Sequence, residues 1–361
     1  MNKKIIIAAG GTGGHIFPGI AAAKELISQG CKVIWIGSLQ GMEAKLIPQH
    51  NLEIHYININ GIRGKNLLTK IGSGLYIFIA ILQSLKILWK CNPDLILGMG
   101  GFVTGPVGIA AWLLRKKLVI HEQNAIAGTS NRILALFANK ILESFPNSFP
   151  ERNYYLHKII LTGLPVRKDL LINLENFKQK QLDLFKILVL GGSRGAKFLN
   201  QMIPSALANM DNLQIIHQTG EQELIITKNL YAELNPKHTH QIISFIDDMS
   251  KAYNAANLVI CRAGASTIFE ILASRSASIL IPLPGAIDDH QTKNALYLVN
   301  HNAAILVNQN ELTVDKLKNL IIEFKNNPNK INYLKEAAKS LYKKYAEYNS
   351  SNKISELIID L

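Results

Sequence analysis

The sequence predicts an α/β protein of two similar domains, each with a parallel β-sheet covered by helices on both faces. Three observations lead to this prediction. The chain has 361 residues, which at ~150 residues per domain suggests two domains. Short, fully apolar runs alternate with helical stretches, as in parallel sheets buried on both faces. A strand, a glycine-rich turn and a helix open the chain, and the same arrangement recurs near its middle.

The first half contains six runs that we predict to be strands, because they are short, apolar and bounded by polar or glycine-containing segments. They are Lys4–Ala9, Lys32–Ile36, Glu53–Ile57, Asp94–Leu97, Leu118–Ile120 and Ile159–Leu161. The helical stretches between them would cover one parallel sheet.

The series of strands restarts after Thr162–Val166 and the polar stretch Asn173–Asp183. We therefore divide the chain into domains of residues 1–164 and 165–341, followed by a helical, Lys- and Tyr-rich end over about 342–361. The strands predicted in the second half are Lys186–Leu190, Gln214–His217, Gln241–Phe245, Leu258–Cys261, Ser278–Ile281 and Ala304–Leu306. Two such domains would leave a cleft where the carboxyl ends of both sheets face each other.

The composition excludes several classes of protein. Hydrophobic residues make up 48% and charged residues 18%, which excludes a disordered chain, a coiled coil and a collagen-like fibre. The three cysteines form no CxxC pair, so we expect a reducing cytoplasm rather than a disulfide framework. The basic start has only five apolar residues before glycines, too few for a signal peptide. The run closest to a membrane span, Ile71–Trp89, is interrupted by Gly72, Gly74, Gln83 and Lys86.

Positive charge is concentrated in the first half of the chain. Residues 1–164 hold 17 Lys and Arg against 7 Asp and Glu, a net +10, whereas the remaining residues hold 22 against 19, a net +3. This asymmetry favours an anionic partner for the first half: nucleic acid, an anionic membrane or a phosphorylated substrate. The alternative is a genomic bias toward Lys, Asn and Ile, although such a bias should not favour one half.

Three glycine-rich loops, residues 10–15, 98–106 and 191–196, follow predicted strands. The first lacks a dinucleotide fingerprint, because Ile16 replaces the third glycine and no acid ends the second strand at Gly37. No loop has the Gly-Lys-Ser/Thr of a P-loop, so NAD and ATP are both disfavoured. The N-terminus of a helix after such a loop attracts phosphate. A tight turn without a ligand stays possible for one loop but is improbable for all three.

Two further segments contain candidate catalytic residues. His15 ends the first loop, and His121-Glu122-Gln123-Asn124 directly follows a predicted strand, where polar residues of a parallel sheet lie at its functional edge. A histidine and a carboxylate there could be an acid–base pair. The alternatives are a structural histidine and local turn capping.

The segment Cys261–Glu270 is again a strand, a glycine turn and a helix. Thr267 and Glu270 fit a capping box, T-x-x-E, and Glu270 could alternatively hold ribose hydroxyls beside a pyrophosphate. Asp288, Asp289 and His290 follow a later strand, but adjacent residues of one loop rarely converge on a metal, so we expect none.

The stretch Leu75–Trp89 is apolar on more than one helical face. Lys65, Lys70, Lys86 and Lys90 flank it. An apolar helix rimmed by lysines suits the surface of an anionic bilayer. The alternative is a helix buried in the core.

Taken together, the motifs resemble those of a known family. GGTGGHIFPGIAAAKEL, GMGGFVTGP, HEQNAIAG, GGSRGA, FIDDM, CRAGASTIFE and DDHQTKNA occur in this order from the first residues to about residue 295. The chain resembles the MurG family, the undecaprenyl-diphospho-muramoylpentapeptide β-N-acetylglucosaminyltransferases of bacterial peptidoglycan synthesis, over essentially its whole length. The resemblance implies a GT-B fold of two Rossmann-like domains whose parallel sheets face a central cleft.

The resemblance also implies an activity and its partners. The enzyme would transfer GlcNAc from UDP-GlcNAc to lipid I with inversion, giving lipid II for the cell wall, cell shape and cell division. The first domain would bind lipid I at the membrane, the second would bind UDP-GlcNAc, and residues 342–361 would pack back on the first domain. The protein would be peripheral on the cytoplasmic face of the inner membrane, with the anionic membrane surface and the cell-wall synthesis machinery as partners. No cofactor, metal or nucleic acid is implied.

Site residues follow from the matching motifs. In the family Thr12, Gly13 and Gly14 would border the donor sugar, and Asn124 would bind its hydroxyls. The nucleotide and the loop that meets the sugar would involve Arg167, Ser193, Ile246, Ala265, Ser266, Thr267, Ile268, Phe269, Glu270 and Gln291, with Glu270 on the ribose. Two positions depart from the family pattern, since Leu164 replaces an Asn and Arg194 replaces a Gln.

Inverting transfer needs a base for the acceptor hydroxyl, and the candidates are His15 and Glu122. A histidine titrates near neutral pH, which suits a base, whereas Glu122 would need a raised pKa or would orient an imidazole. We favour His15. A sugar-nucleotide epimerase of the same fold is the rival enzyme, although it would not need the basic, apolar region over Leu75–Trp89. A nucleic-acid-binding protein is the other rival, but no base-recognition motif is present.

Overall fold

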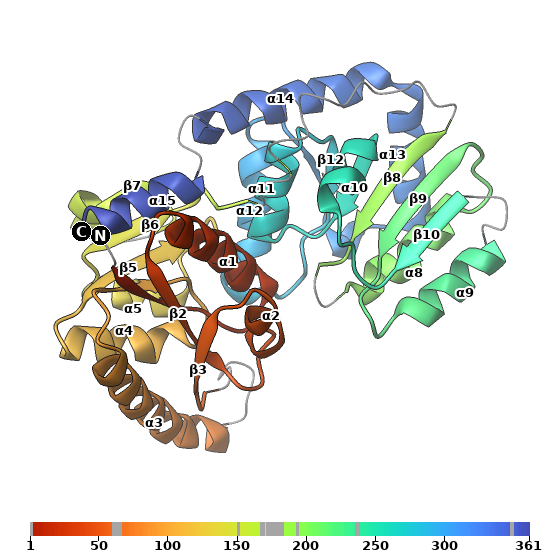
Figure 1. The fold of residues 1–361 in the computed structure, drawn as a ribbon. Helices are drawn as coiled ribbons and strands as arrows, with labels where there is room; N and C mark the ends of the chain where they lie inside the picture. Colours follow the sequence, from red (N-terminus) through yellow and green to blue (C-terminus); the bar gives the residue numbers. More distant parts are fainter. Residues whose placement is uncertain are drawn as a thin grey trace. The chain divides into compact units, whose positions relative to one another are not determined.

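The computed structural model describes residues 3–59, 67–149, 152–166, 170, 184–192, 195–234, 239–346 and 350–361. The chain divides into two compact units (Figure 1). Unit 1 comprises Met1–Val166 and Tyr345–Leu361, and unit 2 comprises Arg167–Lys344.

Unit 1 is built on a seven-stranded parallel sheet in the order β3-β2-β1-β4-β5-β6-β7. The strands are β1 (Lys4–Ala8), β2 (Lys32–Ser38), β3 (Glu53–Ile57), β4 (Leu95–Gly98), β5 (Lys117–Glu122), β6 (Lys140–Glu143) and β7 (Ile159–Leu161). Alternate residues of β1 enter two different cores: Ile5 and Ile7 on one face, Ile6 and Ala8 on the other. A strand buried on both faces has to be apolar throughout, which explains its sequence.

Helices cover both faces of this sheet. They are α1 (Gly13–Ser28), α2 (Glu43–Gln49), α3 (Leu67–Cys91), α4 (Thr104–Leu113), α5 (Thr129–Leu134), α6 (Arg152–Tyr155) and α15 (Ser350–Ile359), with the 3₁₀ turn η1 (Leu156–Lys158). The core on one face contains side chains of α1, α2 and α15, and the core on the other contains side chains of α3, α4 and α5. The end of the chain is fixed to α1, where Gln29 Nε2 donates to Ser355 Oγ at 2.8 Å (Figure 1).

Unit 2 contains a six-stranded parallel sheet in the order β10-β9-β8-β11-β12-β13. The strands are β8 (Phe185–Leu190), β9 (Leu213–Gln218), β10 (Thr239–Ile243), β11 (Leu258–Cys261), β12 (Ser278–Leu280) and β13 (Ile305–Leu306). The helices are α8 (Lys197–Leu207), α9 (Leu224–Leu234), α10 (Met249–Ala255), α11 (Ala265–Ala273), α12 (His290–Val299), α13 (Val314–Asn326) and α14 (Pro328–Ala346), with 3₁₀ turns η2 (Ile287–Asp289) and η3 (Gln309–Glu311).

The predicted fold class, two α/β domains with parallel sheets, is confirmed, with local differences. The sequence analysis missed β6, because only Ile141 and Leu142 of its four residues are apolar. Strand β5 extends two residues further than predicted, so His121 and Glu122 lie at its end rather than after it. The predicted terminal helix is instead the end of α14 and the separate helix α15.

Helix α3 contradicts the alternative that the apolar stretch Leu75–Trp89 is a helix buried in the core. Its segment Gly74–Cys91 is long and apolar enough to cross a membrane by length and composition, with a mean hydropathy of 1.4. In unit 1 this segment is mostly exposed, with 22% of it buried. The buried residues Ala80, Ser84 and Leu88 are spaced four apart, so one face of α3 packs on α4 and the opposite face does not pack on the unit.

Candidate active site

In unit 1 two glycine loops interlock at the carboxyl end of the sheet. The loop after β1 and the loop after β4 approach so closely that a side chain on Gly101 would clash with the carbonyl oxygen of Gly10. Gly101 also has a φ of +80°, a conformation that favours glycine. Both constraints require a glycine here, and together they bring the two loops into backbone contact.

A buried carboxylate that the sequence analysis did not identify supports the first loop. Glu43, at the start of α2, accepts hydrogen bonds from the Ser38 backbone N–H at 2.9 Å and hydroxyl at 2.7 Å, and from the Gly11 N–H at 3.2 Å. The sequence analysis looked for an acid at the end of β2 as a ribose ligand. The acid present lies further along the chain and holds a loop instead.

The first loop leads into α1 through Thr12, which is exposed. Thr12 is the N-cap, and its side chain makes no capping hydrogen bond. Gly13 and Gly14 begin the helix, and no acidic residue lies in its first turn. The free N–H groups and the helix dipole therefore favour an anionic or polar group at this end.

His15 connects this loop to the end of β5. Its Nδ1 lies 2.9 Å from Gln123 Oε1. The Gln123 amide nitrogen lies 2.9 Å from the Met99 carbonyl oxygen and 3.1 Å from His121 Nδ1. His121 Nε2 in turn lies 3.1 Å from the carbonyl oxygen of Gly163. His121 is completely buried, and burial lowers its pKa to about 4, so it is neutral near pH 7.

Glu122 is buried among amide donors. One carboxylate oxygen accepts from the backbone N–H and side chain of Asn124, at 2.9 and 3.3 Å. The other accepts from the Gly128 N–H at 3.0 Å and from Asn131 Nδ2 at 2.8 Å. Glu122 therefore organises the loop 122–128 and holds the half-buried Asn124 in place.

In unit 2 the corresponding edge of the sheet carries α11. Gly264 is the N-cap of this helix, so Thr267 lies inside the first turn and the predicted capping box is wrong. Glu270 accepts instead from the Tyr253 hydroxyl at 3.1 Å. Ser266 Oγ is buried and has no hydrogen-bond partner in the part of the chain that the structure describes. Such a group at a helix N-terminus indicates a place for a polar ligand.

Buried polar side chains hold the neighbouring loops of unit 2. Arg262 donates to the carbonyl oxygens of Ile281 and Pro282 at 3.0 and 3.1 Å, and burial lowers its pKa to about 10. Gln291 accepts from the Leu283 N–H at 2.9 Å. Both interactions fix the segment after β12, and the sequence analysis assigned no role to Arg262.

The remaining predicted site residues are described in part. Ile246 is buried near the end of β10, and Ala265, Ile268 and Phe269 are buried on the core side of α11. Leu164, one of the two departures from the family pattern, is buried in unit 1. Arg167, Ser193 and Arg194 lie outside the described residues. Among the residues that the structure describes, no group of three or more His, Cys, Asp or Glu could hold a metal ion.

Each unit thus brings together one set of predicted residues. Unit 1 gathers Thr12, Gly13, Gly14, His15, Glu122 and Asn124 around the ends of β1 and β5. In unit 2 the residues of α11 and Gln291 follow the neighbouring strands β11 and β12, whereas Ile246 follows the edge strand β10, which β9 and β8 separate from β11.

Family models match both units. Residues 5–143 match the glycosyltransferase family 28 N-terminal domain, and residues 186–353 match its C-terminal domain. The chain belongs to glycosyltransferase family 28. Family 28 enzymes are inverting glycosyltransferases that use UDP-sugars. This membership argues against the alternative that the chain is a nucleic-acid-binding protein.

Individual relatives agree with this membership. A UDP-N-acetylglucosamine–N-acetylmuramyl-(pentapeptide) pyrophosphoryl-undecaprenol N-acetylglucosamine transferase of Shewanella denitrificans is 40% identical over 100% of this chain and 98% of that protein. The crystal structure of Acinetobacter baumannii MurG is similar with a TM-score of 0.79 and 36% identity, covering 99% of this chain and 100% of that one. The resemblance to the MurG family is confirmed.

The rival enzyme class shares only the fold. A UDP-GlcNAc 2-epimerase from Neisseria meningitidis is similar with a TM-score of 0.67 and 14% identity, over 100% of both chains. The family 28 fold therefore does not by itself distinguish transfer from epimerisation, and the sequence identity to transferases does.

Proposed function

We propose that this protein transfers GlcNAc from UDP-GlcNAc to lipid I with inversion, giving lipid II for peptidoglycan. The observation that carries the proposal is the 40% identity, over essentially both full lengths, to a relative named for this transfer. Unit 2 would bind the nucleotide sugar, and unit 1 would bind the lipid-linked acceptor.

The N-terminal end of α11 has groups that can bind the phosphates of the nucleotide. Phosphate oxygens can accept hydrogen bonds from the free N–H groups of the first helical turn and from the unpartnered hydroxyl of Ser266. Glu270 lies one turn further, where its carboxylate, positioned by Tyr253, would accept hydrogen bonds from ribose hydroxyls. The same N–H groups would stabilise the charge that develops on the departing diphosphate.

His15 suits the role of base better than Glu122 does. Both oxygens of Glu122 already accept two hydrogen bonds each from amide groups. His15 is only half-buried and uses Nδ1 for its bond to Gln123, which leaves Nε2 for the substrate. The acceptor hydroxyl oxygen would attack the anomeric carbon as the bond to the UDP oxygen breaks, and its proton would pass to Nε2 of His15.

The first experiment measures transfer of labelled GlcNAc from UDP-GlcNAc to a lipid I analogue. We expect a lipid II product with wild-type protein, and turnover lower by ~10²–10⁴ with His15→Gln, the range for loss of a general base. UDP affinity should not change in this variant. Formation of an isomerised sugar nucleotide without acceptor would instead identify an epimerase.

The second experiment tests Glu270 by calorimetric titration. Glu270→Gln should weaken UDP binding by roughly 1.5–3 kcal/mol, the range for a hydrogen bond to a charged group. The matched ligand 2′-deoxy-UDP lacks one ribose hydroxyl. Its affinity should therefore differ less between the wild type and the variant than the affinity of UDP does. If both proteins discriminate between the two ligands to the same extent, Glu270 contacts Tyr253 but not the ribose.

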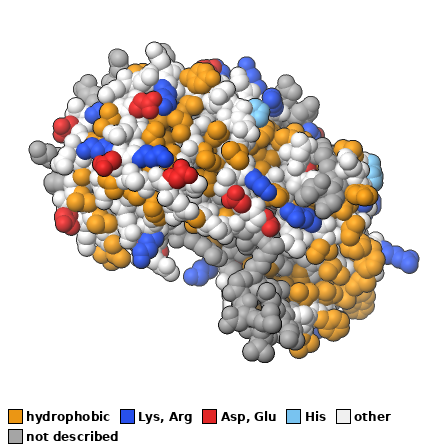
Figure 2. Space-filling view, turned by 180° about the vertical axis from the view of Figure 1, so that it is seen from behind, with side chains coloured by type: hydrophobic (Ala, Val, Ile, Leu, Met, Phe, Trp, Pro, Cys, Tyr) orange, Lys and Arg blue, Asp and Glu red, His pale blue; other side chains and the backbone are white. Residues whose placement is uncertain are grey.

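We also propose that unit 1 docks on the anionic surface of the cytoplasmic membrane through α3, α4 and α5. Figure 2 shows hydrophobic side chains gathered at the lower right, over this part of unit 1. We call these residues the apolar patch, and it comprises Leu75, Phe78, Leu82, Trp89, Trp112, Leu113, Ile133 and Leu136, each about half exposed or more. An exposed apolar surface of this kind is typical of a membrane or protein contact.

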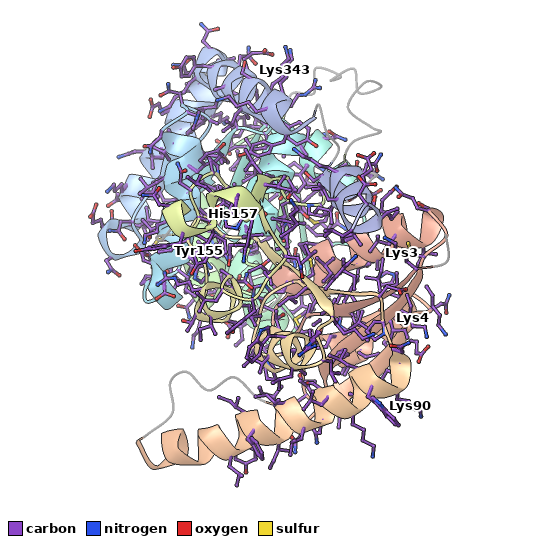
Figure 3. The ribbon with its side chains drawn as sticks, turned by 90° about the vertical axis from the view of Figure 1, so that its left-hand side faces the viewer. Lys3, Lys4, Lys90, Tyr155, His157 and Lys343 are labelled. Carbon is purple, nitrogen blue, oxygen red and sulfur yellow. The ribbon has the colours of Figure 1, made fainter. Side chains whose placement is uncertain are left out.

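Cations lie next to the apolar patch. Lys86 and Lys90 of α3 are exposed, and Lys90 projects at the C-terminal end of the helix (Figure 3). Arg115 follows α4 and is also exposed. The next two residues, Lys116 and Lys117, donate to Asn92 and to the Leu361 carbonyl oxygen. The side chains of Lys65 and Lys70 lie outside the described residues.

Vesicle co-sedimentation tests this docking. Burying each large apolar side chain contributes up to ~1.5–3 kcal/mol, and each nearby lysine ~1 kcal/mol on anionic lipid. Leu82→Ser and Trp89→Ser should therefore each weaken binding, and added salt should weaken it further. The matched control, Ile225→Ser, removes a side chain that is 73% exposed on α9 of unit 2 and should have no effect. Equal binding of all variants, or equal binding to neutral vesicles, would contradict the proposal.

A further inference from the structure

The hydrogen bonds around His15 determine which of its nitrogens carries the proton. The argument starts at the Gln123 amide, whose nitrogen lies 2.9 Å from the Met99 carbonyl oxygen. A carbonyl oxygen only accepts, so the NH₂ group of Gln123 has to face Met99. The amide oxygen then faces His15 Nδ1 at 2.9 Å. Because that oxygen also only accepts, His15 has to donate from Nδ1.

His121 completes the same chain of donors. Its Nε2 faces the Gly163 carbonyl oxygen at 3.1 Å and therefore carries a proton. His121 is neutral, since burial lowers its pKa to about 4, so its Nδ1 accepts the second N–H of Gln123 at 3.1 Å, an N–H that the His121 carbonyl oxygen also faces at 3.2 Å. All three donors point from His15 toward Gly163, and hydrogen bonds aligned in this way polarise one another.

The second glycine loop covers the bond between His15 and Gln123. A side chain on Gly100 would lie 2.7 Å from His15 Nδ1 and 3.0 Å from Gln123 Oε1. Gly100 also has a φ of +86°. The backbone of this loop therefore lies directly against the hydrogen bond, and Gln123 itself is 1% exposed. A buried bond of this kind is held in one geometry more firmly than an exposed one.

We propose that Gln123 is a positioning residue that holds His15 in its Nδ1–H tautomer, so that the Nε2 lone pair is available to accept the substrate's proton. This inference rests on the proposed role of His15 as the base. When Nε2 takes the proton, Nδ1–H continues to donate to Gln123 Oε1, so the amide stabilises the imidazolium without a net charge. In serine proteases an aspartate holds the catalytic histidine in this way, and a wrong tautomer there lowers turnover strongly.

The decisive experiment reads the tautomer directly in the substrate-free protein. Long-range ¹H–¹⁵N correlation spectra of histidine-labelled protein distinguish Nδ1–H from Nε2–H imidazoles, and the His15→Gln variant identifies the His15 signals. We expect the Nδ1–H tautomer in the wild type. The variant Gln123→Met, similar in size but without hydrogen-bonding groups, should populate the Nε2–H tautomer.

Kinetics supply the second readout. Gln123→Met should lower kcat by about 10–100-fold, less than the ~10²–10⁴ expected when the base itself is lost, while KM for UDP-GlcNAc changes less than about threefold. The matched control, Ser84→Ala, removes another buried hydrogen bond of unit 1, the one to Ala80, and should change neither the tautomer nor kcat.

Either of two results would overturn the proposal. One is an Nε2–H tautomer in the wild type, and the other is an unchanged tautomer and kcat in Gln123→Met. Because the tautomer is measured without substrate, it stands apart from the activity. If His15→Gln keeps its turnover while the tautomer shifts as expected, the base assignment fails but the positioning by Gln123 holds.

Discussion

Replacing Glu122 by Gln separates its two possible roles, loop anchor and catalytic base. Each carboxylate oxygen accepts two hydrogen bonds from amide N–H groups. A glutamine has one oxygen, so its NH₂ group would face two donors and leave both unpaired. An unpaired buried donor costs about 1–3 kcal/mol. With two such donors, we expect the variant to lose roughly 2–6 kcal/mol of unfolding free energy.

The three tryptophans make this loss measurable in one unit. Trp35, Trp89 and Trp112 all belong to unit 1, so tryptophan fluorescence during urea unfolding reports on unit 1. If Glu122 is an anchor, the transition moves to lower urea and KM rises because Asn124 is displaced, while kcat of the folded fraction keeps its pH dependence.

The matched control for Glu122 is its neighbour across the sheet. Glu143 of β6 pairs with Glu122 in the strand register and is also buried. Glu143→Gln should destabilise unit 1 without changing the kinetics of the folded enzyme. A Glu122→Gln variant of wild-type stability, with kcat lowered by ~10²–10⁴ as for a lost base, would refute the anchor argument and move the base from His15 to Glu122.

Two further outcomes are expected. His217 of unit 2 is buried, and burial lowers its pKa to about 3; the unfolded chain therefore binds the extra proton first as pH falls below ~6.5, and unit 2 should lose about 2 kcal/mol of stability between pH 7 and pH 5. Unit 2 contains no tryptophan, so its urea unfolding is followed by circular dichroism. The loss should occur in the wild type and in His157→Gln, a control at an exposed histidine, but not in His217→Gln. The same pH dependence in all three proteins would exclude His217 as the cause. Gly101→Ala introduces a clash with the Gly10 carbonyl oxygen at a positive φ, and should lower the unfolding free energy of unit 1 by at least ~1–2 kcal/mol, whereas Gly74→Ala on α3, which has open space around it, should not.

The sequence was sufficient to predict the fold because the relevant signals are local. A strand buried on both faces is a short apolar run, and each glycine loop appears as a motif of a few residues. Strand β6 shows the limit of such signals, since Lys140 and Glu143 at its ends leave only two apolar residues. The capping box over Thr267 failed for a related reason: the T-x-x-E spacing is present, but the helix already begins at Ala265.

The supporting residues of the site were not predictable because their partners are far away in the sequence. Glu43 holds Gly11 across 32 residues, and Gln123 holds His15 across 108 residues. The HEQN motif identifies Gln123 as a polar residue near the end of a strand, but nothing in the motif names its partner. Only the three-dimensional arrangement gives these side chains their roles.

The polar residues of unit 1 divide by whether their hydrogen-bonding atoms are already used. Glu43 and Glu122 are buried carboxylates whose oxygens hold loop backbones, and Gln123 donates and accepts within the protein. A group saturated in this way gains little from contact with a substrate, and moving it would leave buried donors unpaired. His15 differs because the one described hydrogen bond of its side chain is at Nδ1 and the side chain is half-buried. The carboxylates near the site therefore maintain its shape, and under our proposal the proton passes to the imidazole of His15, which the Gln123 amide holds.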